Sequence, residues 1–83
     1  MSMEQDEDFL TTYDLNISAV LVALGHPLDH IERKDKGRAL FFFKSSPAVK
    51  TAAQRYWKQE IKINPQKLFD SLKFLKNRLY SNF

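Results

Sequence analysis

The chain of 83 residues contains no cysteine. It can therefore form neither a disulfide framework nor a thiolate metal site, and this absence fits a reducing compartment. Its longest apolar run, residues 19–24, is far shorter than the ~20 residues that span a bilayer, and its start lacks the basic and apolar regions of a signal peptide. We therefore expect a soluble, cytoplasmic protein that does not bind membranes.

Glycine and proline are also scarce, with 2 and 3 copies, which leaves little room for long loops. A composition of 43% hydrophobic and 28% charged residues is typical of a globular protein, and a chain this short rarely divides into two domains. We predict a single domain over residues 9–83. The acidic residues 1–8 show no periodicity and are predicted to be a flexible arm without secondary structure.

Basic residues are absent from the first part of the chain. Residues 1–30 contain six acidic residues and no Lys or Arg, a net charge of −6, whereas residues 31–83 hold all 13 basic residues and four acids, a net charge of +9. This asymmetry predicts a basic surface for an acidic partner, or an acidic arm that folds back on that surface.

The first half of the domain shows signals for a strand, a helix and a hairpin. Residues 9–13 are rich in aromatic and β-branched side chains, which predicts a short edge strand. Asp14 is a good N-cap for a helix over 15–24 that is apolar on all sides and therefore central, and Gly25 with Pro27 ends it. Residues 28–34 and 38–44 flank a turn in which Gly37 can adopt positive φ, so we predict a β-hairpin.

The second hairpin strand carries three adjacent phenylalanines. Phe41 and Phe43 point to one face, and Leu40 and Phe42 to the other. A strand with two apolar faces is usually covered on both, so we expect helices on each side of the sheet, or one Phe left for a partner.

Two helices with proline starts follow. Ser46 and Pro47 begin a helix that should run to about residue 59, and Asn64 and Pro65 begin one over residues 65–80, with a leucine stripe at helical spacing. The sequence thus predicts an α+β fold in the order (β)αββαα, a small antiparallel sheet with three helices. The predicted core joins the phenylalanines to Leu21, Leu24, Val49, Leu72 and Leu75.

The order of several short motifs resembles an uncharacterised family. The motifs are L-G-H-P at 24–27, I-E at 31–32, F-x-F at 41–43, S-P at 46–47, Y-W at 56–57, I-N-P at 63–65 and L-K-x-R-L-Y at 75–80. Together they are similar to a domain-of-unknown-function family of short proteins from bacteria, archaea and their phages. The resemblance covers about residues 9–80 and implies no activity. It does imply the context of phage or mobile-element accessory genes.

The basic residues of the last two helices are the first candidates for a binding site. Cations that neutralise phosphates, beside rings that stack on bases, are what single-strand binding requires. On the last helix Lys73 and Lys76 lie within about 60° of Phe69 and Tyr80. The alternative is that the lysines only solvate helix faces while the rings belong to the core. The predicted nucleic-acid-binding residues are Lys50, Arg55, Trp57, Lys58, Lys73, Lys76 and Arg78.

Other candidate sites are weaker. The two helix starts, at Ser46 and Asn64, have lysines nearby and could bind a phosphate, or be ordinary caps. His26, Asp29 and His30 form H-x-x-D-H, but a metal site needs further ligands from elsewhere, so we predict no metal. We see no nucleophile triad, buried carboxylate pair or phosphate loop, and therefore predict neither an enzyme nor a cofactor.

Two hypotheses of function remain open. The first is a small non-enzymatic accessory protein that binds nucleic acid, or a nucleoprotein, through the basic surface of the last two helices. The second is a protein-interaction module, an inhibitor or adaptor of an acidic protein or a homodimer, that uses the same surface and can be shielded by the acidic arm. Phosphates and carboxylates attract the same cations, so the sequence does not separate the two.

Overall fold

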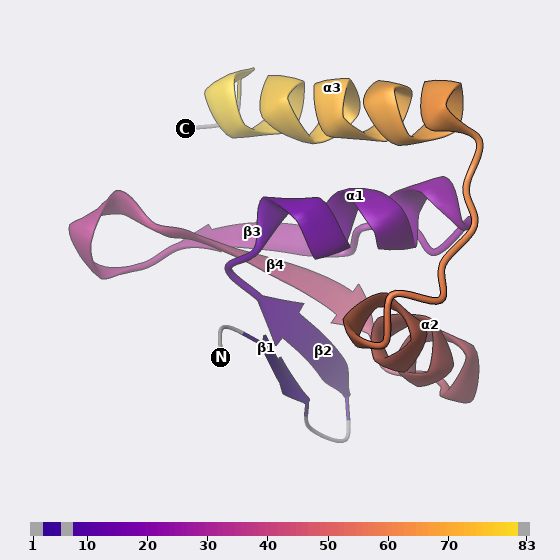
Figure 1. Cartoon of the computed structure of the whole chain (residues 1–83). Helices are drawn as coiled ribbons and strands as arrows, with labels where there is room; N and C mark the ends of the chain where they lie inside the picture. Colours follow the sequence, from indigo (N-terminus) through magenta and orange to yellow (C-terminus); the bar gives the residue numbers. More distant parts are fainter. Residues whose placement is uncertain (1–2, 6–7, 82–83) are drawn as a thin grey trace.

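A four-stranded antiparallel sheet carries three helices in the computed structural model, which describes residues 3–5 and 8–81 (Figure 1). In the sheet the strands lie in the order β1 (Met3–Gln5), β2 (Phe9–Thr12), β4 (Ala39–Lys44) and β3 (His30–Arg33). Between and after them the chain forms α1 (Leu15–Ala23), α2 (Pro47–Trp57) and α3 (Pro65–Ser81). The predicted α+β class and order (β)αββαα are confirmed. None of the described helices is long and apolar enough to cross a bilayer.

Strand β1 was not predicted. The acidic arm over residues 1–8 was expected to lack secondary structure, yet Met3–Gln5 pairs antiparallel with β2. As a result β2 lies between β1 and β4, not at the edge of the sheet as predicted. An edge strand exposes unpaired N–H and C=O groups, and a segment joined to it by a short connection can bond to them whatever its own propensity. Residues 1–2 and 6–7 of the arm lie outside the described residues.

The three helices begin where their caps predict. The Asp14 carboxylate accepts a hydrogen bond from the Asn16 N–H at 2.8 Å, and α1 follows directly. Ser46 Oγ accepts from the Val49 N–H at 3.1 Å at the start of α2. The Asn64 side chain caps α3 in the same way. These bonds satisfy N–H groups that the first turn of a helix leaves unpaired.

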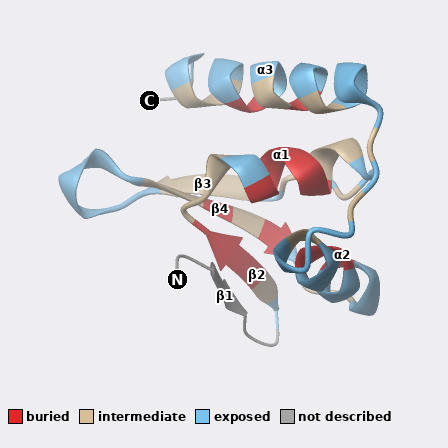
Figure 2. Cartoon of the chain, viewed as in Figure 1, coloured by how far each residue is buried: buried red, intermediate tan, exposed pale blue. Residues whose placement is uncertain are grey.

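Helix α1 is central, as predicted, because α2 and α3 both pack against it. Residues 17–21 are buried without exception, so more than a full turn of the helix is enclosed, and Figure 2 shows this red stretch of α1 next to α3. The core combines it with Phe41 and Phe43 of β4. Leu24, by contrast, was predicted in the core and is 39% exposed, because it is the C-cap of α1 and lies past the buried turns.

The second face of the sheet carries its own small aromatic cluster. Phe42 stacks on His30 with ring centroids 4.1 Å apart, and Phe9 meets both rings edge-on. Neither Phe9 nor Phe42 belongs to the core that the helices share with Phe41 and Phe43. The expectation of helices on both faces is therefore wrong. These rings shield one another, which reduces the apolar surface that a covering helix would need to bury.

Candidate nucleic-acid interface

Helix α3 has an apolar side and an exposed side. Its leucine stripe packs against the core, where Leu75 is fully buried and Leu68, Leu72 and Leu79 are half-buried. Leucines at a spacing of three or four residues fall on one face of a helix, so their burial against α1 fixes which side of α3 faces solvent. Everything on the opposite side is available to a partner.

That exposed side carries two cations between two rings. Phe69 and Tyr80 are 61% and 81% exposed, and Lys73 and Lys76 between them are also exposed. Their spacing places all four on one line along about 16 Å of helix; we name this set the α3 stripe. Among the described residues no acid forms an ion pair with either lysine. Large exposed aromatic side chains beside unpaired cations are unusual on a surface that only contacts water.

Arg78, which was predicted as a phosphate contact, is less available than these lysines. It is half-buried, and its guanidinium lies 5.9 Å from the centroid of the Phe74 ring. Its Nε is buried and has no hydrogen-bond partner in the described part of the protein. Arg78 therefore lies beside the α3 stripe and is not one of its members.

The outward side of α2 forms a second basic surface. Lys50, Arg55 and Lys58 are exposed, and Trp57 is 44% exposed with its ring edge-on to Tyr56 at 5.3 Å. Opposite them, Val49, Ala52 and Ala53 are buried and bring α2 close to α1. We call Lys50, Arg55, Trp57 and Lys58 the α2 face. It contains no acid, and no ion pair of the described residues involves its cations.

The two surfaces are separate, although the sequence led us to expect a single one. Both α2 and α3 pack on α1 but not closely on each other, and Figure 1 shows them on different sides of it. Residues 58–64 connect the two helices. This segment begins with Lys58 of the α2 face and also carries the exposed Lys62. The sequence correctly placed Lys73 and Lys76 on the exposed side of α3, as it did the cations of the α2 face, but Arg78 is half-buried. The angle between the two helices could not be predicted.

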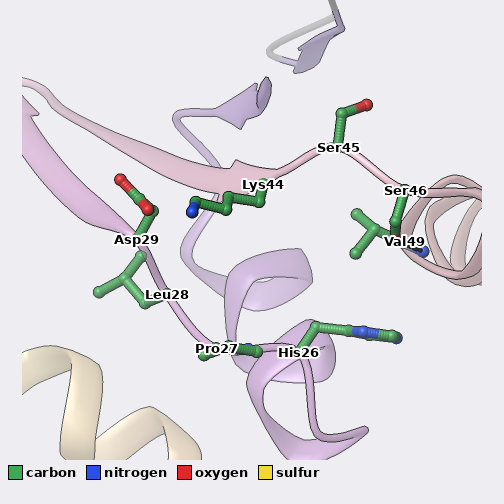
Figure 3. A pocket seen from close by; sticks show the side chains of 8 residues that line it. All are labelled: His26, Pro27, Leu28, Asp29, Lys44, Ser45, Ser46 and Val49. Atoms are coloured by element: carbon green, nitrogen blue, oxygen red, sulfur yellow. Dashed lines mark hydrogen bonds between the residues drawn. The ribbon is translucent and has the colours of Figure 1, made fainter. Parts of the chain in front are cut away.

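A hollow of about 450 Å³ lies at the start of α2 (Figure 3). Lys44, Ser46 and His26 line it, and Ser46 begins one of the two helices whose starts could bind a phosphate. Asp29 lines the same hollow, so an anion would meet a carboxylate as well as Lys44. Ser45 also contributes to the lining, but its hydroxyl points away from His26. The charges in this hollow are mixed, unlike those of the α2 face.

The H-x-x-D-H segment forms a carboxylate–histidine cluster. His30 Nδ1 lies 2.6 Å from Asp29 Oδ2, and His30 Nε2 lies 3.1 Å from Glu32 Oε2. Both ring nitrogens therefore have carboxylate partners. His26 is separate and lines the hollow beside α2. The described residues contain no group of three or more His, Cys, Asp or Glu side chains able to hold a metal ion.

This cluster makes stability depend on pH. The hydrogen bond to Asp29 raises the pKa of His30 above its ordinary 6.5, desolvation opposes this, and Glu32 adds to the rise. Lys34 and then His30 lower the pKa of Glu32 below its ordinary 4.5. A raised folded-state histidine pKa stabilises the fold fully below pH 6.5, and the effect is lost as the pH rises through the raised value. The stabilisation from Glu32 is present above pH 4.5 and is lost as the pH falls through the lowered pKa of its carboxyl group.

We therefore predict that Asp29→Asn lowers the melting temperature more below pH 6.5 than well above it. The difference will be small because the His30 side chain is 38% exposed and solvent weakens the pair. An NMR titration gives the direct test, since the pKa of His30 should fall towards its ordinary value in the variant. Equal His30 pKa values in both proteins would contradict the prediction.

A comparison with protein families gives one result. A model described as Domain of unknown function (DUF5659) matches residues 7–81, nearly the whole chain. The chain belongs to the DUF5659 family. The resemblance predicted from the motifs is thereby confirmed, and in this DUF5659 chain L-G-H-P ends α1, F-x-F lies on β4, and S-P and I-N-P begin α2 and α3. The family description assigns no activity and no site residue. Neither the curated proteins nor the solved structures include a match.

Proposed function

We propose that this DUF5659 protein is a non-enzymatic, cytoplasmic protein that binds nucleic acid through the α3 stripe and the α2 face. The observation that carries the proposal is the α3 stripe, in which Phe69 and Tyr80 are more than half exposed on either side of two lysines that form no ion pair with any described residue. An accessory role in a phage or mobile element is the context that we propose for it, on the strength of the family resemblance.

The chemistry of this surface suits a flexible polyanion. Lysines neutralise phosphates and release counterions, which gives affinity without reading sequence. Exposed rings stack on the faces of bases. Every type of base can stack in this way, and the bases are most accessible in a single strand. On the α2 face, Trp57 adds a third ring beside Lys58, so each of the two basic surfaces offers both kinds of contact.

The proposal is tested by fluorescence anisotropy of labelled single- and double-stranded oligonucleotides, titrated with the protein at several salt concentrations. Micromolar or tighter binding that weakens steeply with salt supports it, and tighter binding of single strands supports a role for the rings. Absence of binding at low salt overturns it.

The variant Lys73→Gln/Lys76→Gln should bind single strands more weakly and with less dependence on salt. Each lost phosphate contact reduces the slope of log affinity against log salt by about 0.7, so two contacts give about 1.4. Both side chains are exposed, so the melting temperature should hardly change. Lys36→Asn is the control, because it removes one charge at the tip of the β3–β4 hairpin and asparagine tolerates the positive φ there. If Lys36→Asn lost as much affinity per removed charge as the double variant, the lysines of α3 would have no special role in binding.

An interaction with an acidic protein is the second candidate, and the exposed Trp57, Phe69 and Tyr80 favour it because large aromatics are typical of binding hot spots. It would use the same two surfaces, or pair two copies of the chain through them. The salt titration separates the candidates, because a polyanion with many phosphates gives a steep slope and a compact interface with apolar anchors gives a shallow one.

A further inference from the structure

An apolar cleft lies between α1, the end of α2, the connecting segment and the start of α3. Its volume is about 380 Å³, within the range of small-ligand sites. The apolar part of its lining consists of Val20, Ile61, Ile63 and Leu68, and two polar residues, Tyr56 and Gln59, complete it. The cleft thus lies at the junction of the α2 face with the segment that leads to α3.

The two polar residues of the cleft, the half-buried Tyr56 and the exposed Gln59, have side-chain groups that a ligand could reach. Within the described part of the chain, neither the Tyr56 hydroxyl nor the Gln59 side-chain amide makes a hydrogen bond. Burial raises the pKa of Tyr56, so its hydroxyl stays protonated and can donate at neutral pH. Gln59 offers both donors and an acceptor. A few polar groups in an apolar hollow are the usual composition of a ligand site.

Gln59 occupies a backbone position that favours glycine. Helix α2 ends with the Gln59 N–H bonded to Tyr56 O at 3.0 Å and the Glu60 N–H bonded to Arg55 O at 2.9 Å. This arrangement places Gln59 in the left-handed region, with φ of 61°, where a side chain is strained and glycine is not. A residue kept in a strained conformation, with its side chain in a cleft, points to a use for that side chain.

The segment that frames the cleft is basic. Residues 58–67 contain Lys58, Lys62 and Lys67 against a single acid, Glu60, and all four are exposed. No ion pair of the described residues involves them. A ligand that enters the cleft while joined to several phosphates would therefore meet a cation for each of them. A neutral apolar ligand, or one with a single negative charge, has no need of three lysines.

We infer that this cleft binds one unstacked base of a single-stranded nucleic acid, held between the apolar residues and hydrogen-bonded by Gln59 and Tyr56. Splayed bases are recognised by burial of the ring and by hydrogen bonds to the edge that pairing leaves free. The inference rests on the proposed function and extends it, because it adds a base site to surfaces that otherwise contact phosphates and ring faces. The Gln59 amide is the group that would distinguish one base edge from another.

The test compares two labelled single strands of equal length and charge, an oligothymidylate and an abasic strand, in anisotropy titrations with the full chain. The wild type should prefer the oligothymidylate by more than about tenfold, because a base in the cleft and the bases stacked on exposed rings both contribute; the variant isolates the share of the cleft. Gln59→Gly should reduce that ratio several-fold and leave the melting temperature equal or higher, since glycine relieves the left-handed strain. The loss of binding then cannot come from unfolding.

Lys36→Gly is the matched control. Lys36 is the other non-glycine residue with positive φ in the described chain, at 64°, and it lies in the β3–β4 hairpin and not in the cleft. This variant should gain stability in the same way. The lost charge should weaken the binding of both strands equally, so the ratio of the two affinities should equal that of the wild type.

Each result decides the inference. A ratio that Gln59→Gly leaves unchanged overturns the base site, because the Gln59 side chain then plays no part in binding. Equal binding of both strands by the wild type overturns it, while nucleic-acid binding through phosphate contacts stands. Binding of neither strand removes the proposed function and the base site together.

Discussion

Replacing Phe43 with alanine is expected to destabilise the fold by about 3–5 kcal/mol, the range for deleting a buried phenylalanine. Phe43 is fully buried, and it joins strand β4 to the core that α1, α2 and α3 share. Domains of this size have a total stability of about 5–15 kcal/mol, so the variant should be close to unfolding at physiological temperature. Urea denaturation followed by circular dichroism measures the change.

The matched control is Phe42→Ala, the same substitution one residue away on the other face of the sheet. Phe42 is half-buried and contacts Phe9 and His30, not the helices. We expect a loss of about 1–2 kcal/mol, because less apolar area returns to water and part of an aromatic contact disappears. Equal losses in the two variants would mean that the two faces contribute equally, against the arrangement in the structure.

This contrast also marks how far the sequence could be read. The two-residue period of a strand correctly grouped Phe41 with Phe43 and Leu40 with Phe42. It could not say which pair faces the helices, because both pairs are apolar. The choice depends on where α1 crosses the sheet, and that is set by packing between residues distant in sequence. The leucine stripe of α3 was easier, since only one side of that helix is apolar throughout.

Backbone features outside regular periodicity were the least predictable. Gly37 was expected to have positive φ and does, whereas the positive φ of Lys36 and Gln59 was not foreseen, since neither residue type favours it. The pairing of β1 with β2 was missed for a similar reason: it depends on an open strand edge and not on the residues of β1. The cleft beside Gln59 was consequently invisible in the sequence, although its flanking lysines were not.

The second large effect is expected on binding and not on folding. Phe69→Ala/Tyr80→Ala should weaken single-strand binding by at least about thirtyfold, because stacking contributes about 1–3 kcal/mol per ring. The same variant should keep the wild-type melting temperature, because both side chains lie largely in solvent on the side of α3 away from α1. Anisotropy titration at one fixed salt concentration measures the affinity, and calorimetry the stability.

Phe74→Ala provides the matched control on the same helix. Phe74 is 41% exposed and lies off the α3 stripe, beside the Arg78 guanidinium. If the rings of the stripe stack on bases, Phe74→Ala keeps the affinity and the salt dependence of the wild type. An equal loss in the control would show that any exposed ring on α3 matters alike, as in an apolar protein interface. A double variant that binds as the wild type would leave the lysines as the only contacts of α3, and nucleic acid would then be held by charge alone.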